Sequence, residues 1–120
     1  MNQGLLAYGK EGSTEVELTE FIDCAERYEL SISNSSAVQN FTFTSPQILN
    51  ELIQFLENEE MDELGISASN EGPTSLKKDD EFLDRAFLRT YSKKEKRIAF
   101  EITLSLPDLL SALKQASTDL

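Results

Sequence analysis

The chain has 120 residues, a formal net charge of −11, one cysteine and no histidine. A chain of this length is typical of a single domain. It is long enough to bury a core that is stable without disulfides or metals. The absence of histidine excludes a Cys–His nucleophile pair within the chain, makes zinc and copper sites improbable, and leaves few groups for general acid–base catalysis. We therefore expect a protein that is not an enzyme and that has no cofactor and no metal.

The charge is distributed unevenly. Residues 1–76 carry 14 acids and two bases, whereas residues 77–120 carry eight acids and nine bases. Direct binding of nucleic acid needs clustered Lys and Arg to neutralise phosphates, so this balance argues against it. An acidic front part favours a basic protein surface as partner, although acidity also serves solubility alone.

The chain has no long apolar run. Leu5–Tyr8 is too short for the core of a signal peptide, and no segment approaches the ~20 apolar residues of a membrane-spanning helix. We therefore expect a cytoplasmic protein with no membrane contact. Cys24 is expected to be a buried, inert thiol.

The first 33 residues predict a tail, a helix and a strand. Residues 1–13 are glycine-rich and predict a tail or a weak edge strand. Thr14 and Glu17 have the spacing of a capping box, and apolar residues then recur at steps of three and four, which predicts a helix over 15–27. Alternation at Val16 and Leu18 leaves a strand as the alternative. The alternating segment Glu29–Ser33 predicts a strand.

The next segment predicts the second strand of a hairpin, then a helix. Ala37–Thr44 alternates, with Phe41 and Phe43 expected to face the core. Ser45 and Pro46 then have the order of an N-cap and a first helical residue. The apolar stripe of the predicted helix consists of Ile48, Leu49, Leu52, Phe55 and Leu56.

The rest of the chain predicts a linker, a short helix, a second hairpin and a last helix. Residues 65–75 are rich in Gly, Ser and Pro and predict a linker, and Asp80 is placed to cap a helix that reaches Ala86. Phe87–Ser92 and Arg97–Ser105 predict two strands. One face of the second strand should hold Ile98, Phe100, Ile102 and Leu104. Pro107 opens the last helix, with a stripe of Leu106, Leu109, Leu110, Leu113 and Ala116.

The strand-to-helix segment 41–56 resembles segment 102–117. At an offset of 61 residues, five of the sixteen positions are identical, including Pro46 and Pro107. Either the chain contains a duplication, with half-repeats at about 14–64 and 76–120, or strand–proline–helix order has arisen twice independently. Both explanations predict an α+β fold in one domain. An antiparallel sheet is built from two β-hairpins, each followed by a Pro-initiated amphipathic helix.

Acidic residues are the strongest candidates for a binding site. The clusters 57–63 and 79–84 lack the ligand spacing of a calcium loop, so a solvated charged face is expected in preference to a cation site. We expect contact with a basic partner through nine residues. They are Glu57, Glu59, Glu60, Asp62, Glu63, Glu17, Glu20, Asp23 and Glu26.

Three functions remain open. The first is an immunity or antitoxin type of inhibitor, in which carboxylates mask the basic surface of a partner such as a nuclease toxin. The second is a nucleic-acid mimic that inhibits a DNA- or RNA-binding protein. The third is a structural subunit of a homodimer. The basic segment Lys93–Arg97 predicts a solvated hairpin turn, or a contact with the acidic half of another copy.

Overall fold

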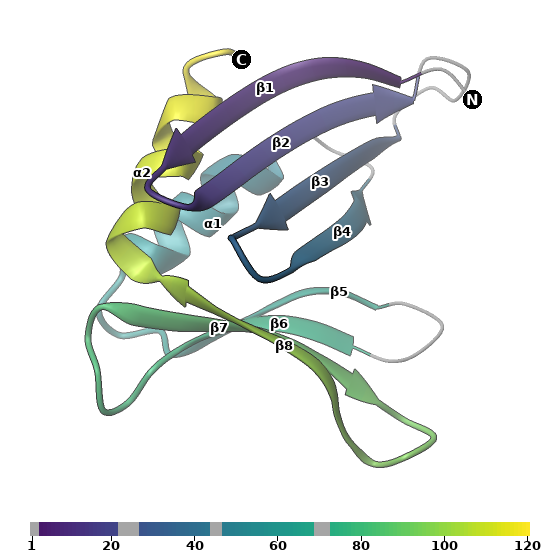
Figure 1. Cartoon of the computed structure of the whole chain (residues 1–120), viewed down its shortest axis with the longest axis vertical. Coiled ribbons are helices and arrows are strands. Elements are labelled where there is room, and N and C mark those ends of the chain that lie inside the picture. Colours follow the sequence, from purple (N-terminus) through teal and green to yellow (C-terminus); the bar gives the residue numbers. More distant parts are fainter. Residues whose placement is uncertain (1–2, 22–26, 44–46, 69–72) are drawn as a thin grey trace.

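The computed structural model describes residues 3–21, 27–43, 47–68 and 73–120 of this single α+β domain. Along the chain, four strands and a helix are followed by four more strands and a second helix (Figure 1). The elements are β1 (Gln3–Glu11), β2 (Thr14–Phe21), β3 (Tyr28–Ser33), β4 (Val38–Phe43), α1 (Ile48–Glu57), β5 (Glu63–Ala68), β6 (Pro73–Lys78), β7 (Arg85–Ser92), β8 (Arg97–Ser105) and α2 (Leu106–Ser117).

The strands form two antiparallel sheets, not the single sheet expected from sequence. Sheet A has the order β1-β2-β3-β4 and sheet B the order β5-β6-β7-β8. The sheets face one another, and both helices lie at one end between them (Figure 1). Gln39 Nε2 of β4 donates to Thr90 Oγ1 of β7 at 3.2 Å, and Asn34 Nδ2 donates to the carbonyl of Thr103 at 2.9 Å. Two layers result because each sheet has one apolar face, and stacking buries both faces.

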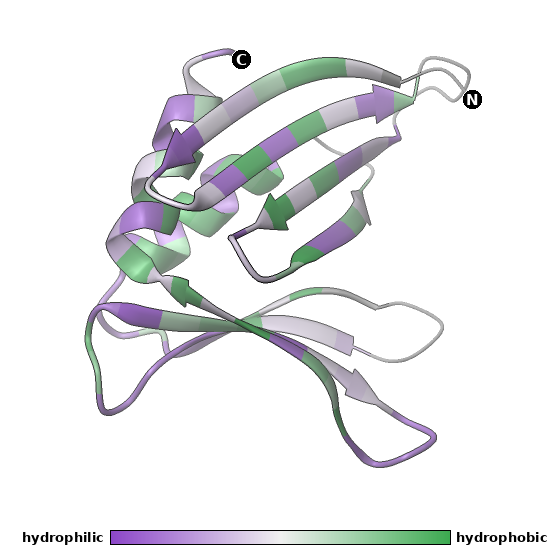
Figure 2. Ribbon diagram, in the orientation of Figure 1, coloured by the Kyte–Doolittle hydropathy of each residue, from purple (hydrophilic) through white to green (hydrophobic). Residues whose placement is uncertain are grey.

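The predicted helix over 15–27 is wrong where the structure describes it, because residues 14–21 form strand β2. Thr14, Val16 and Leu18 are buried, whereas Glu17 is exposed on the outer face. Figure 2 shows the resulting alternation of hydrophilic and hydrophobic residues along β2. The strand follows a tight turn at Gly12, whose φ of 59° suits glycine. Pairing with β1 on one side and β3 on the other outweighs the local capping signal.

Of the two alternatives for the glycine-rich start of the chain, the edge strand is the one that forms, as the nine-residue strand β1 at the edge of sheet A. Two further predictions need correction. The predicted linker 65–75 contains the second part of β5 and the first part of β6, while 69–72 lie outside the described residues. The helix expected from Asp80 is replaced by turns. In one of them Asp79 Oδ1 accepts a hydrogen bond from the Glu81 amide at 2.8 Å.

Other predictions agree with the structure. β3 and β4 pair as an antiparallel hairpin, with Phe41 buried. All five residues of the α1 stripe are buried, and Pro107 lies in the first turn of α2, where the Ser105 side chain caps the Asp108 amide. The expected roles of Cys24, Ser45 and Pro46 fall outside the described residues.

The second strand of the later hairpin follows its prediction only in part. Ile102 and Leu104 of β8 are buried, but Ile98 and Phe100 are exposed. A register shift opposite the Thr90–Tyr91 step lies between Phe100 and Ile98, so Phe100 remains in register with Ile102 and only Ile98 lies beyond the shift. Residues 97–101 of β8 are all exposed, whereas Thr90 and Ser92 of the paired strand β7 are buried.

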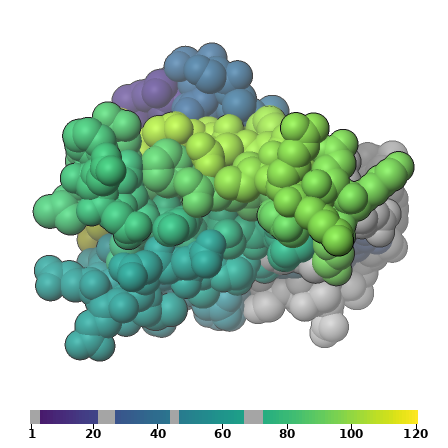
Figure 3. Space-filling model, turned by 90° about the horizontal axis from the view of Figure 1, so that it is seen from below, coloured from purple at the N-terminus to yellow at the C-terminus, as the bar shows by residue number. Residues whose placement is uncertain are grey.

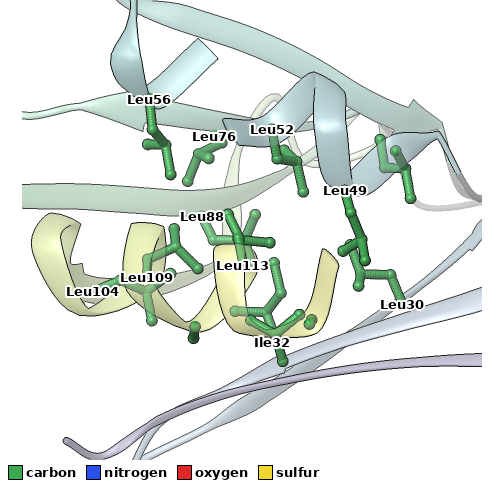
Figure 4. Packing of buried hydrophobic residues seen from close by; sticks show 14 of the residues in the cluster. Leu30, Ile32, Leu49, Leu52, Leu56, Leu76, Leu88, Leu104, Leu109 and Leu113 are labelled. Carbon is green, nitrogen blue, oxygen red and sulfur yellow. The ribbon is translucent and has the colours of Figure 1, made fainter. Parts of the chain in front are cut away.

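One hydrophobic core joins both sheets and both helices. Figure 4 shows Leu30 and Ile32 of sheet A, Leu76, Leu88 and Leu104 of sheet B, and leucines of both helices in one cluster. α2 packs mainly on β1 and β2, so the last helix covers the first sheet. The approach is closest at Gly9, where an added Cβ would lie 1.8 Å from the carbonyl oxygen of Ala112. Neither helix in the described part of the chain has the length and apolar character to cross a membrane.

Candidate functional site

Two acidic loops meet at one end of sheet B. The first joins α1 to β5 and comprises residues 58–62, and the second joins β6 to β7 and comprises 79–84. The β5–β6 hairpin brings the two loops together. Because its strands are antiparallel, the end of β6 lies beside the start of β5. The Lys78 amide donates to the carbonyl of Asp62 at 2.8 Å, and the Lys78 ammonium donates to the carbonyl of Asn58. The same ammonium lies 4.8 Å from the centroid of the Phe55 ring.

The two loops line an open groove of about 560 Å³, here called the acidic groove. Four carboxylates and one ammonium line it. Its residues are Leu56, Glu59, Asp62, Lys78, Asp79, Asp80, Leu83 and Leu106. Within the described ranges, none of these four carboxylates forms an ion pair. Because four carboxylates face one ammonium, most of the negative charge of the groove is uncompensated.

Apolar side chains border the carboxylates of the acidic groove. Leu83 is 90% exposed, and the neighbouring Phe82 is 47% exposed with the Arg85 guanidinium 4.2 Å from its ring centroid. An exposed leucine beside unpaired carboxylates suits the side chains of lysine and arginine, which combine an aliphatic stem with a cationic head. The arrangement therefore has the charge and the apolar surface to contact cationic side chains.

The structure divides the predicted cluster 57–63. Glu59 and Asp62 line the acidic groove. Glu57 ends α1 and pairs with Lys114 of α2 at 3.2 Å. Glu60 is exposed in the turn, and Glu63 accepts a hydrogen bond from the Ser75 hydroxyl at 3.0 Å on the outer face of sheet B. Two of the five predicted residues thus share one surface.

The predicted acids of the first segment lie elsewhere. Glu17 is exposed on the outer face of sheet A, and Glu20 is half-buried near the end of β2. Both belong to the first sheet, whereas the acidic groove is formed by loops around sheet B. Asp23 and Glu26 lie outside the described residues. The single acidic helix face that would have joined these four carboxylates does not form over β2.

Other charged groups are engaged in local contacts. Arg89 pairs with Glu101 across β7 and β8, beside a second groove of about 430 Å³ on the outer face of sheet B. On sheet A, the Tyr8 hydroxyl donates to Glu15 at 2.9 Å, and this hydrogen bond is the main cause that raises the pKa of Tyr8. In the described ranges, no three acidic, histidine or cysteine side chains are grouped so as to hold a metal ion.

Sequence reasoning did not identify Asp79, Asp80 and Leu83 as partners of the first acidic cluster. A signal was present, because Leu64 and Ile66 alternate, as do Thr74 and Leu76, and alternation predicts paired strands. Because residues 65–75 were interpreted as a linker, this alternation was not taken as evidence for a hairpin. A hairpin over these residues places 62 beside 78 and thereby joins the two clusters.

Comparison of the chain with protein-family models, with curated proteins and with solved structures finds no match.

Proposed function

We propose that this chain is a non-enzymatic, cytoplasmic binding protein whose acidic groove masks a basic surface of a partner protein. The partner class that fits best is a toxin with a cationic active cleft, such as a nuclease, which makes the chain an immunity or antitoxin type of inhibitor. One observation carries the proposal. Two acidic segments separated in sequence converge on one groove, where four carboxylates face a single ammonium and, among the described residues, form no ion pair.

The electrostatics of the groove support this role. Unpaired carboxylates in a concave surface focus the field and accelerate encounter with a basic protein. The exposed Leu83 provides an apolar contact next to the charges, and interfaces of standard type combine such apolar centres with polar rims. A surface selected for solubility alone does not require carboxylates and apolar side chains to converge in this way.

The absence of catalysis is also part of the proposal. In the described part of the chain, the buried polar side chains are Thr14, Thr74, Thr90 and Ser92, so no ionisable group is buried there. Enzymes commonly shift the pKa of a catalytic group by burying it. A groove of exposed carboxylates supports recognition better than chemistry.

The decisive experiment compares two triple variants as bait. The groove variant carries Glu59→Gln, Asp62→Asn and Asp80→Asn, which remove charge but keep shape. Asp79 is left intact because it caps the Glu81 amide. The control variant carries Glu17→Gln, Glu29→Gln and Glu51→Gln, which remove the same charge from the outer face of sheet A and from α1.

Each bait is immobilised, captured proteins are identified, and the purified partner is titrated by calorimetry. The wild type and the control variant should bind one basic partner one-to-one. The groove variant should bind it roughly 100-fold more weakly, because each interfacial ion pair lost costs about 1 kcal/mol or more. Equal binding by all three proteins contradicts the proposal. Capture of many unrelated nucleic-acid-binding proteins would instead indicate a mimic.

The fold also supports an internal duplication as its origin. Strands β4 and β8 and the two helices align at the offset of 61 residues that the sequence echo gives. The first strand of each sheet carries a register shift, at Leu5–Ala7 in β1 and at Gly65–Ser67 in β5. On this proposal each unit consists of four strands and a helix, and function lies where the units differ, at the acidic groove.

A further inference from the structure

The β7–β8 hairpin is a second surface that the folded core does not use. Tyr91 is 40% exposed, Ile98 47% and Phe100 37%. Tyr91 pairs with Ile98, and both line the groove on the outer face of sheet B, whereas Phe100 pairs with Thr90 and lies on the opposite face of the hairpin. Apolar side chains gathered on a projecting hairpin are characteristic of a contact surface. Figure 2 shows this hydrophobic stretch of β8 next to a hydrophilic tip.

The hairpin is basic in an otherwise acidic molecule. Residues 85–101 carry six bases and two acids, whereas the rest of the chain carries five bases and twenty acids. Its tip holds Lys93, Lys94, Lys96 and Arg97, all exposed. The tip is ordered, because the Lys96 amide donates to the carbonyl of Ser92 at 2.8 Å and the Glu95 amide to its hydroxyl at 3.1 Å. An ordered basic tip loses little conformational entropy on binding.

The acidic groove is complementary to this tip in both charge and polarity. The groove combines unpaired carboxylates with Leu83, and the hairpin combines ammonium groups with Tyr91 and Ile98. Figure 3 shows the β6–β7 loop and the β7–β8 tip at opposite ends of the molecule, so one copy cannot bring its own tip to its own groove. The contact can form only between two copies.

We infer that the β7–β8 hairpin of one copy docks into the acidic groove of a second copy, head to tail. Such a contact joins two different surfaces, so each dimer keeps one free groove and one free hairpin, and assembly continues to chains or closes to a ring. The inference uses the same groove as the proposed function but does not depend on it. A basic partner and a second copy would compete for the groove. Binding of the partner would therefore dissociate the self-associated protein.

Sedimentation velocity with two variants tests the contact. The hairpin variant carries Lys93→Glu and Lys94→Glu, and the groove variant is the amide triple at residues 59, 62 and 80. The mass of the wild type should rise with concentration from 13.5 kDa and should fall again when salt screens the charges. Each variant alone should stay monomeric. Far-UV circular dichroism and thermal unfolding confirm that both variants fold, since every changed side chain is exposed.

The mixture of the two variants is the sharpest measurement. The intact hairpin of one fits the intact groove of the other, so the mixture should form one-to-one dimers and stop there. A wild type that stays monomeric at every concentration overturns the inference, and so does a mixture that stays monomeric while the wild type associates. The hairpin variant also separates the two proposals, because it should lose self-association and still capture a basic partner, whereas the groove variant should lose both.

Discussion

The two sheets have the same number and order of strands but are covered very differently. Sheet A receives α2 across its inner face, and α2 approaches so closely that Gly9 has no room for a side chain. Sheet B carries a hairpin that leaves the core, and Gly65 in its first strand has nothing within 4 Å of the position of an added Cβ. Both sheets contribute to the core, but sheet B also carries exposed loops and a hairpin that α2 does not cover. Substitutions at matched positions in the two sheets test this difference.

Gly9→Ala should have the largest effect. Its Cβ would lie 1.8 Å from the Ala112 carbonyl oxygen, and neither β1 nor α2 can yield without separating. We expect a loss of about 3 kcal/mol or more in the free energy of unfolding, at the upper end for overpacking. Gly65→Ala is the control, and its effect should lie between zero and a gain of about 1 kcal/mol. Urea denaturation measures both, and similar losses would contradict the contrast.

Ile32→Ala and Ile98→Ala compare the same residue type in the two sheets. Ile32 of β3 is fully buried and Ile98 of β8 is 47% exposed. The first substitution should cost about 2–5 kcal/mol, because it leaves a cavity in the core. The second should change stability by about 0.5 kcal/mol or less. A large loss at Ile98 would show that the projecting hairpin belongs to the cooperative core.

Thr90→Val tests the polar link between the sheets. The Thr90 hydroxyl lies 3.0 Å from that of Thr74 and accepts a hydrogen bond from Gln39 of the other sheet at 3.2 Å. Valine keeps the shape and leaves the Thr74 hydroxyl and the Gln39 amide without this partner. The expected cost is about 1–2 kcal/mol. In a double-mutant cycle with Gln39→Ala the losses should be less than additive, and strict additivity would show that this hydrogen bond contributes nothing.

Tyr8→Phe should have the smallest effect, visible only in alkali. The hydrogen bond to Glu15 raises the pKa of Tyr8 in the folded protein above its unfolded value of about 10. The protonated phenol therefore favours the folded state, and this contribution is complete below the unfolded pKa and disappears as the pH rises through the folded one. Unfolding curves between neutral and strongly alkaline pH should show a shallower decline for Tyr8→Phe. Glu15→Gln should lower the pKa in a spectroscopic titration of the phenols.

The sequence predicted the local elements where apolar spacing was unambiguous. Both helices, the β3–β4 hairpin and the buried side of β4 follow from periodicity alone. β2 was misread because Thr14 and Glu17 satisfy a capping pattern, and only pairing with β1 and β3 reverses that preference. The division into two sheets could not be predicted, because strand partners are set by tertiary packing.

The candidate site was predicted in part for the same reason. Glu59 and Asp62 were identified from charge density, but their convergence with Asp79 and Asp80 depends on the β5–β6 hairpin. Gly65 and Pro73 favoured the interpretation of this segment as a linker. In the structure Gly65 lies at a register shift and Pro73 at the start of a strand, two positions where these residues are tolerated in sheets. The density of acidic residues in the sequence identified Glu59 and Asp62. The placement of Asp79 and Asp80 beside them depends on the pairing of β5 with β6.

The packing of α2 on β1 also has a consequence for synthesis on the ribosome. The amides of Tyr8 and Lys10 donate to the side chains of Asp119 and Gln115, which lie 111 and 105 residues further along the chain. At ribosomal speeds that interval takes roughly 5–20 s. During this time the inner face of β1 and β2 lacks its helix, and the outer edge of β1 is unpaired. The packing of sheet A against α2 can therefore be completed only after translation has passed α2.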